Sequence, residues 1–246
     1  RAGDVIPEIV KVIIEKRIKN SKSYIIPAIC PSCKTVCNKK EDEVVLRCLN
    51  PHCQAQLEGK IKHFVSKNCM DIDGLGEKIV QLLIQNNLVK NISDIFSLSH
   101  LQISELDRMG DKSASNIIDS INKSKNTTMA RFIHGLGIRN VGNHLSKILA
   151  KHFNYNFNHL INSQFEELIL IDEVGDIVAE SIINYFKDEN NLNIINRCFE
   201  LGIQFSIPEQ QSNKLINQIF VITGALSKLT RNEAKSLIEK NGGVVS

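Results

Sequence analysis

The sequence lacks any run of about 18 uncharged apolar residues, so it predicts no transmembrane helix and no membrane partner. It also lacks a secretory signal, because Arg1, Asp4 and Glu8 interrupt the apolar residues at its start. With 42% hydrophobic and 23% charged residues, the composition is typical of a globular protein. The first residue is not Met and the last five, Gly242–Ser246, look like the start of a strand, so we expect a piece of a longer chain.

A strong excess of positive charge is also absent, since the formal net charge is only +3. Residues 1–70 carry 13 Lys/Arg and 7 Asp/Glu, and the remainder of the chain carries more acidic than basic residues. This balance argues against nucleic-acid binding by bulk electrostatics alone. If the second part of the chain grips DNA, it must use oriented backbone dipoles and a few well-placed cations.

Five of the seven cysteines fall within 24 residues, and four of these form two short-range pairs. Cys30-Pro-Ser-Cys33 is followed after fourteen residues by Cys48-Leu-Asn-Pro-His-Cys53, and Glu43–Arg47 between the pairs has the character of a strand. Two short-range pairs separated by enough chain for a β-hairpin are typical of a tetrahedral zinc site. We therefore predict that Cys30, Cys33, Cys48 and Cys53 hold zinc in a closed, structural finger.

Two disulfides or four free thiols are the alternatives to zinc. Disulfides require an oxidising compartment and would leave three cysteines unpaired. His52 is an alternative ligand to the adjacent Cys53. The remaining cysteines lie outside the pattern and are expected to be ordinary reduced thiols; these are Cys37, Cys69 and Cys198.

From residue 70 onward the chain repeats itself about every 33 residues. Gly76, Gly110, Gly142 and Gly175 are separated by 34, 32 and 33 residues, and an apolar residue precedes each of them. The fourth residue after each glycine is small or narrow, and the seventh is aliphatic. These two positions lie on the same face of a helix. These pairs are Val80 with Leu83, Ala114 with Ile117, Ser146 with Leu149, and Ala179 with Ile182.

A shorter apolar segment precedes each glycine, so the repeating unit is helix, tight hairpin, helix. This unit resembles the helix-hairpin-helix motif, whose hairpin has the pattern apolar-Gly-apolar-Gly. The first repeat fits fully, with Gly74 and Gly76, whereas Arg108, Asn140 and Glu173 replace the earlier glycine in the others. A helical solenoid, in which the glycines merely turn the chain, is the alternative.

Glycine adopts positive φ readily and lets a backbone approach a ligand closely, so we expect the hairpin amides and the following helix N-terminus to bind a DNA phosphate. Such contacts carry no base information. Asp172, Glu173 and Asp176 surround the fourth hairpin and would repel phosphate, so that hairpin is expected to pack rather than bind. The candidate DNA-binding residues are Gly74, Gly76, Arg108, Gly110, Lys112, Arg139, Asn140, Gly142 and Lys147.

The pattern changes after residue 210. Ile219–Ile222 predicts a buried strand, Thr230-Arg231-Asn232-Glu233 a capping box that opens a helix to about Lys240, and Gly242-Gly243 its end. This strand-helix-strand order resembles the start of a BRCT domain, although any small α/β unit is compatible. At the other end, Ala2–Pro7 resembles the last strand of an OB domain.

The sequence thus predicts a multidomain, mainly α chain: residues 1–27 as the end of an OB domain and a linker, 28–62 as a small four-cysteine zinc finger, 63–209 as a helical domain of four helix-hairpin-helix repeats, and 210–246 as a truncated α/β BRCT domain. This order is similar to the C-terminal part of bacterial NAD-dependent DNA ligases. Local strings that carry the resemblance include His63–Ser66, Met70–Gly76 and Leu136–Arg139.

The resemblance implies a cytoplasmic, nucleoid-associated bacterial enzyme that seals nicks in double-stranded DNA with NAD and magnesium during replication and repair. The family's Lys-x-Asp-Gly motif is absent. The most similar string is Asp71–Gly74, and its first residue is aspartate where the motif has lysine. No catalytic residue is therefore expected in this segment, and a BRCT partner is not identified. A non-enzymatic DNA-binding or scaffold protein of DNA repair is the main alternative, and a repair nuclease subunit is another, although no carboxylate cluster is placed for metals.

Overall fold

The computed structural model describes residues 10–18, 20–39, 45–207, 214–215, 218–224, 226 and 229–245. Two compact units divide the chain, Arg1–Cys53 and Gln54–Ser246. The strand expected near Ala2–Pro7, part of the one expected at Glu43–Arg47, and residues 210–213 at the start of the expected BRCT segment lie outside the described residues. In the described part of the chain, no helix is both long and apolar enough to cross a membrane.

The first unit contains little regular structure. A short 3-10 helix, η1 (Ile14–Lys16), precedes β1 (Cys37–Asn38) and β2 (Arg47–Cys48), which pair in antiparallel fashion with Cys37 opposite Cys48. The expected strand before Cys48 is therefore short, because Val45 and Leu46 lie outside it. An isolated bridge between Ile29 and Val36 closes the loop that carries the first cysteine pair.

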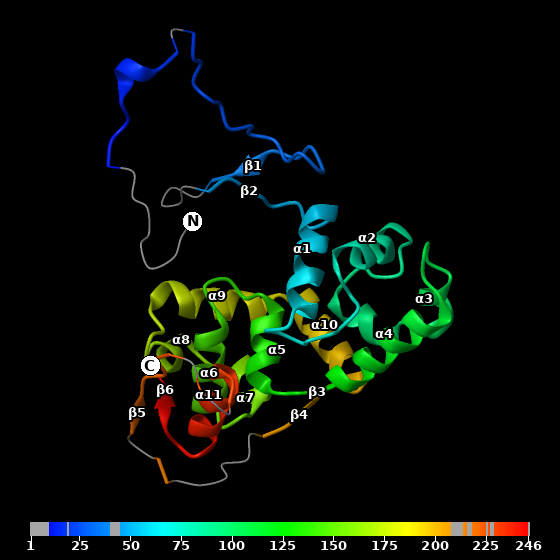
Figure 1. Ribbon diagram of the computed structural model, residues 1–246, viewed down its shortest axis with the longest axis vertical. Coiled ribbons are helices and arrows are strands. Elements are labelled where there is room, and N and C mark those ends of the chain that lie inside the picture. Colours follow the sequence, from blue (N-terminus) through cyan, green and yellow to red (C-terminus); the bar gives the residue numbers. More distant parts are fainter. Residues whose placement is uncertain are drawn as a thin grey trace. The chain divides into compact units, whose positions relative to one another are not determined.

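The second unit is mainly helical (Figure 1). Short helices alternate with longer ones, and each longer helix of the repeat begins directly after a hairpin glycine. In chain order the elements are α1 (Gln54–Val65), α2 (Glu77–Gln85), η2 (Ile92–Ser97), α3 (His100–Ser104), α4 (Asp111–Ser124), β3 (Asn126–Thr127), α5 (Met129–Leu136), α6 (Asn143–His152), α7 (Phe157–Ile161), α8 (Phe165–Leu168), α9 (Asp176–Lys187), α10 (Glu189–Glu200) and β4 (Gln204–Phe205).

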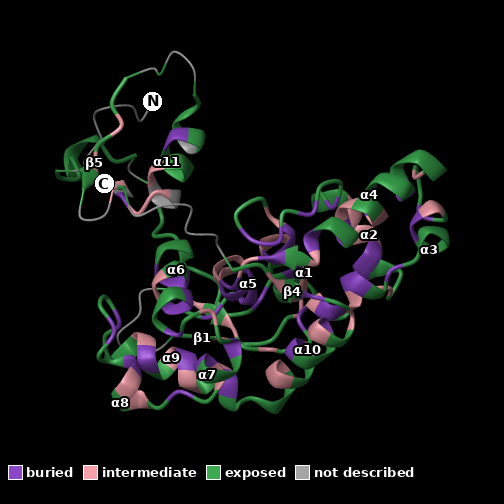
Figure 2. Cartoon of the chain, turned by 90° about the horizontal axis from the view of Figure 1, so that it is seen from below, coloured by how far each residue is buried: buried purple, intermediate pink, exposed green. Residues whose placement is uncertain are grey.

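The periodic positions of the repeat build the core, as the sequence pattern predicts. At offsets four and seven after each hairpin glycine every residue is at most 3% exposed, because these positions share the inward face of the helix. Figure 2 shows buried, half-buried and exposed residues together on the helices of this unit, so each helix buries only part of its surface. Aliphatic side chains thus hold α2, α4, α6 and α9 in the core.

Phenylalanine rings form the centre of this core. Phe132 of α5 is fully buried and lies 5.6 Å, centroid to centroid, from both Phe157 and Phe199, and 5.4 Å from Phe205. The last contact exists because β4 pairs in parallel with β3, so residues 204–205 lie beside residues 126–127. Side chains far apart in sequence therefore meet around one ring.

Helix α1 belongs to the helical unit and not to the finger. We expected the finger to end at residue 62, which falls inside α1. Ile61, Phe64 and Val65 of this helix are buried, and α1 packs against α2 and α5. The division at Cys53 follows from this packing, because the apolar face of α1 is needed by the helical core.

The last segment contains β5 (Ile219–Phe220), α11 (Arg231–Lys240) and β6 (Val244–Val245), with β5 and β6 parallel. The capping box is present: the Thr230 amide donates to Glu233 Oε2 at 2.7 Å, and the Glu233 amide donates to Thr230 Oγ1 at 3.2 Å. The strand is shorter than expected and not buried, since Ile219 is 73% exposed. A single described partner strand and one helix leave that side chain uncovered.

Candidate functional site

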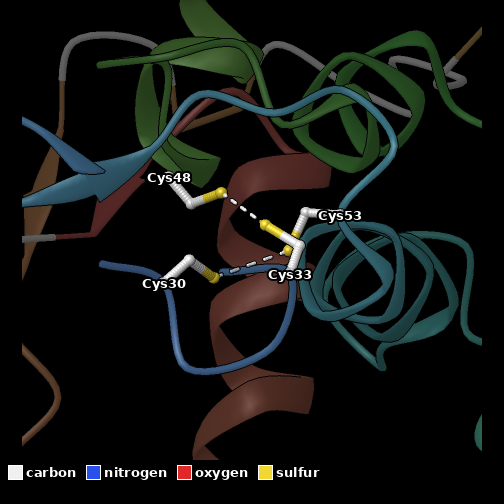
Figure 3. A group of neighbouring side chains, drawn as sticks. All are labelled: Cys30, Cys33, Cys48 and Cys53. Atoms are coloured by element: carbon white, nitrogen blue, oxygen red, sulfur yellow. Dashed lines mark hydrogen bonds between the residues drawn. The ribbon is translucent and has the colours of Figure 1, made fainter. Parts of the chain in front are cut away.

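Four cysteine thiols converge in the first unit (Figure 3). Their sulfur atoms all lie within 4.8 Å of one another, with 3.8 Å between Cys30 and Cys53 and 3.4 Å between Cys33 and Cys48. A tetrahedral zinc ion with bonds of about 2.3 Å requires sulfur atoms about 3.8 Å apart. The four thiols therefore have the spacing of a metal centre, with Cys53 fully buried and Cys30 nearly so.

The local chain prepares this cluster for a cation. The hydroxyl and then the amide of Thr35 lower the pKa of the Cys33 thiol to about 5, and the amides of Cys33 and Ser32 lower the pKa of Cys30. The amide of Asn50 also favours the Cys48 thiolate, but burial and the three neighbouring thiols outweigh it and raise the pKa of Cys48 to about 12. The site thus favours the thiolate form of Cys30 and Cys33 and disfavours that of Cys48. A positive ion among the four sulfur atoms would stabilise all four thiolates.

In three hairpins two buried apolar residues flank two exposed ones, and in the second hairpin Leu106 is buried while Met109 is half-buried. Ile138 and Val141 anchor the third hairpin, where the Val141 amide donates to the Ile138 carbonyl at 3.1 Å. The residue two before the second glycine has positive φ in all four hairpins. These residues are Gly74 at +88°, Arg108 at +61°, Asn140 at +63° and Glu173 at +66°.

The expectation that the second glycine would need positive φ is wrong. Gly76, Gly110, Gly142 and Gly175 have φ between −70° and −115° with extended ψ, a conformation open to any residue. The tight turn places its left-handed residue two positions earlier, where glycine and asparagine are favoured. The backbone of the chain therefore does not explain why glycine recurs at the second position.

Packing within the chain does not explain it either. A Cβ added at Gly76, Gly110, Gly142 or Gly175 would meet no described atom within 4 Å. Gly74 is different, because a Cβ there would lie 2.6 Å from Cγ1 of Ile117 in α4. Positive φ and the contact with Ile117 therefore explain why residue 74 is glycine. The four second glycines instead leave an open space in front of the helix that follows.

These glycines also leave helix amides uncapped. Each is the N-cap of the helix that follows it and provides no side-chain hydrogen bond to α2, α4, α6 or α9. By contrast, side chains of Asn91, Ser99, Thr128, Asn156 and Asp188 cap η2, α3, α5, α7 and α10. Uncapped N-terminal amides carry partial positive charge and can bind an anion.

The expected cations lie around these ends. The Arg108 side chain is 90% exposed at the second hairpin and forms a surface ion pair with Asp107, at 3.6 Å. Lys112 is exposed in the first turn of α4, Arg139 at the third hairpin, and Lys147 one turn along α6. Exposed ion pairs are weak, so Arg108 remains available to an anion.

The third and fourth hairpins are in direct contact. The side-chain Nδ2 of Asn140 donates to Ser181 Oγ of α9 at 3.3 Å, and His144 Nε2 lies 3.0 Å from Glu173 Oε1. Asn140 thus joins two repeats in addition to shaping its own turn. Glu173 brings a carboxylate to the N-terminus of α6, while Asp172 and Asp176 are exposed around the fourth hairpin itself.

Two cationic positions were missed from the sequence. Two residues after the second glycine come Lys78, Lys112, His144 and Ile177, all exposed in the first turn of their helices. Only Lys112 of these was expected to bind DNA, although the repeat register contains the signal for Lys78 and His144. Lys78 also lines a depression of about 510 Å³ at the first hairpin, together with Gly74 and Gly76.

The hairpin units match known motif families. Residues 131–195 match the family model described as "Helix-hairpin-helix motif", and residues 68–123 match "SAM-like Helix-hairpin-helix tandem". The chain is therefore mainly helical, with helix-hairpin-helix motifs and a cysteine cluster.

The whole chain is similar to bacterial proteins named DNA ligase. It is 41% identical over 250 residues to one from Bacillus subtilis, 43% over 244 residues to one from Geobacter sulfurreducens, and 43% over 247 residues to one from Coxiella burnetii. These alignments cover 99% of this chain but only 36–37% of each relative. The resemblance inferred from the sequence is confirmed, and the chain spans little more than a third of those relatives.

Proposed function

We propose that this chain is the DNA-binding, C-terminal part of an NAD-dependent DNA ligase that seals nicks in duplex DNA. The observation that carries the proposal is the N-termini of α2, α4 and α6, where the capping glycine is required neither by its φ nor by packing within the described residues. Gly175 before α9 has the same geometry, but the acidic residues around it disfavour an anion there. An anion that approaches the backbone closely accounts for both features. The relatives named DNA ligase make the DNA phosphate the anion that fits best.

The role proposed for this segment is positional. Hairpins on both sides of a nick grip phosphates without reading bases, and the two DNA ends are thereby held in place for reaction. The chemistry of adenylation from NAD, with magnesium, belongs in this proposal to residues beyond the segment. The same proposal places the protein with DNA in the bacterial cytoplasm, during replication and repair.

Zinc is the metal that we propose for the four cysteines. Sulfur ligands at this spacing suit a soft ion better than magnesium or calcium, and four protein ligands leave no position for a reacting water. The ion would fix the loops of residues 28–39 and 45–53 in a region with only two short strands. Zinc here is structural in this proposal.

Four repeats and a BRCT start complete the proposed domain order. The fourth unit, α8 with α9, shares the turn geometry of the others, with Glu173 at φ +66° and Gly175 as N-cap. The parallel β5-α11-β6 unit supports a BRCT start, because Gly243 is packed closely: an added Cβ would lie 2.7 Å from Ile238. The end of an OB domain at residues 1–27 remains part of the proposal.

Aspartate at the N-caps tests the phosphate role separately from the turn. Gly142→Asp should keep or slightly raise helix stability, since aspartate caps a helix well and φ of −87° suits it. The same carboxylate would occupy the amides and repel phosphate, so affinity for a nicked duplex, measured by fluorescence anisotropy, should fall about tenfold or more, the equivalent of a single charge-assisted contact. Gly175→Asp in the acidic fourth hairpin is the matched control and should leave affinity nearly unchanged. Equal affinities for both variants and the wild type would contradict the proposal.

A further inference from the structure

A second group of metal-ligating side chains lies in the helical unit, away from the four-cysteine cluster. His63 lies in the last turn of α1, Cys69 follows in the loop, and His134 lies in the last turn of α5. One ligand atom from each residue lies within 4.8 Å of those of the other two. The relevant segments are held together by the packing of α1 against α5.

The separation of two of the ligand atoms is compatible with a shared metal ion. Cys69 Sγ lies 3.7 Å from His63 Nε2. A tetrahedral ion with a sulfur bond of about 2.3 Å and a nitrogen bond of about 2.05 Å requires a separation of about 3.6 Å. A thiolate with two imidazoles is also a ligand set that favours zinc or another soft ion.

The cluster contains a polar atom that the protein does not satisfy. His134 Nδ1 is buried and has no hydrogen-bond partner in the described part of the chain, and Cys69 is fully buried. Buried polar atoms normally have a partner, and a metal ion would supply one for this nitrogen. His63 Nε2 lies 2.7 Å from the His134 carbonyl oxygen, and a metal would replace that hydrogen bond.

The loop that carries Cys69 is held in place independently of any ion. Arg131 Nε donates to the Cys69 carbonyl and its Nη2 to the Lys67 carbonyl, each at 2.7 Å. The Cys69 amide donates to the Ser66 carbonyl at 2.9 Å. The thiol is therefore fixed beside the two imidazoles before a metal arrives, which lowers the entropy lost on binding.

We propose that His63, Cys69 and His134 form a second metal site, which binds zinc with three protein ligands and one further position. The site joins the C-terminal ends of α1 and α5. Gly137, the left-handed C-cap of α5, follows at once, and a Cβ there would lie 3.6 Å from Cδ2 of His63. An ion at this point would fix the base of the third hairpin, independently of whether the chain functions in a ligase.

Zinc counting by atomic absorption on the dialysed chain tests the site. Wild-type protein equilibrated with zinc should hold two ions per chain, and Cys69→Ala should hold one. Cys198→Ala is the matched control, because Cys198 is equally buried on α10 but belongs to no such group among the described residues, and it should keep both ions. Circular dichroism checks that each variant is folded, and His134→Phe provides a second route if Cys69→Ala is not.

The two zinc sites can be told apart. Cys30→Ser/Cys33→Ser should lose the finger ion and keep one, whose cobalt-substituted form should show weak thiolate charge-transfer absorption from a single sulfur. One ion in the wild type and one in Cys69→Ala would overturn the proposal without touching the finger. Two ions in both proteins would overturn it as well, because the second ion would then lie elsewhere.

Discussion

At the scale of single residues, the hairpins divide two demands between two positions. The first position takes positive φ and tolerates Arg108, Asn140 and Glu173 as well as glycine. The second has ordinary φ and is glycine every time. Steric strain in a non-glycine left-handed residue costs on the order of 1 kcal/mol, which a folded chain can tolerate. A side chain at the second position would block the approach of a ligand to the helix amides, and the folded chain cannot compensate for that.

Replacing one charged residue in the third hairpin and one in the fourth should show which of the two hairpins contacts DNA. Arg139→Ala should weaken binding to a nicked duplex by roughly 1–3 kcal/mol, the usual size of a charge-assisted contact. Glu173→Ala should be neutral or slightly favourable, because it removes a carboxylate beside the N-terminus of α6. Anisotropy at one fixed salt concentration measures both. If the two variants lost affinity equally, the fourth hairpin would have to be treated as a DNA contact.

Alanine at the two glycines of the first hairpin should have different effects on folding. Gly74→Ala should lower the free energy of unfolding by about 1–3 kcal/mol, since it combines left-handed strain with a clash against Ile117. Gly76→Ala meets open space at φ −70° and should change that free energy by less than about 0.5 kcal/mol. Urea unfolding followed by circular dichroism compares them. Equal losses would show that Gly76 has a structural role.

At the scale of elements, most helices with a described N-cap fall into two groups, and only the short η1 and α8, which lack a side-chain cap and follow no hairpin glycine, belong to neither. Side chains cap η2, α3, α5, α7 and α10, which leaves few free amides at those ends. The helices after the hairpins, α2, α4, α6 and α9, begin at bare glycine. A side-chain cap stabilises a helix by only a few tenths of a kcal/mol relative to glycine, so glycine costs these ends little stability and leaves their amides open to an anion.

The first unit is the element that should depend on metal. Cys48→Ser should release zinc and loosen residues 28–53, because thiolate ligation contributes on the order of 10 kcal/mol of apparent binding free energy in so small a region. Helix α1 should stay intact, since its buried residues pack in the helical unit. Hydrogen exchange with metal analysis measures both effects. Unchanged exchange in residues 28–53 after zinc loss would contradict the structural role.

At the scale of the whole molecule, the charge of the chain is small for the DNA-binding role proposed. Net charge is +3, and the acidic groups of the fourth hairpin lie in the same helical unit as the cations of the third. Affinity must therefore come from a few oriented contacts and not from a broad basic surface. This distribution also explains why the hairpins should not contribute equally.

Binding to duplex DNA should be indifferent to sequence and only moderately sensitive to salt. Three phosphate-binding hairpins predict a slope of log affinity against log salt of about −3, at roughly −0.9 for each neutralised phosphate. Anisotropy titrations between low and physiological salt, on two nicked duplexes of unrelated sequence, measure both properties. A large preference for one duplex would contradict the proposed role in a ligase.

The stability of the helical unit should depend strongly on one ring. Phe132→Ala should lower its free energy of unfolding by about 3–5 kcal/mol, because the ring is fully buried among Phe64, Phe157, Phe199 and Phe205. Thermal unfolding by circular dichroism measures the loss. Leu101→Ala, at a side chain that is 64% exposed, is the control and should have little effect. A loss below about 1 kcal/mol for Phe132→Ala would mean that the core can collapse around the gap.

The sequence by itself determined the periodic features. The spacing of Cys30, Cys33, Cys48 and Cys53, the register of the repeat glycines and the capping box at Thr230 are local patterns, and local geometry fixes what each of them forms. The offset-four and offset-seven residues could be assigned to the core for the same reason. Lys78 and His144 were within reach of the same register, although they were missed.

Only the tertiary structure decided which glycine carries the turn and what surrounds each one. The φ of Gly142 and the empty space before it depend on where α5 and α6 pack, and no short string of residues contains that information. The place of α1 in the helical unit and the meeting of His63, Cys69 and His134 arise in the same way. They bring together residues up to 71 positions apart, and such contacts are set by the packing of whole helices and not by sequence proximity.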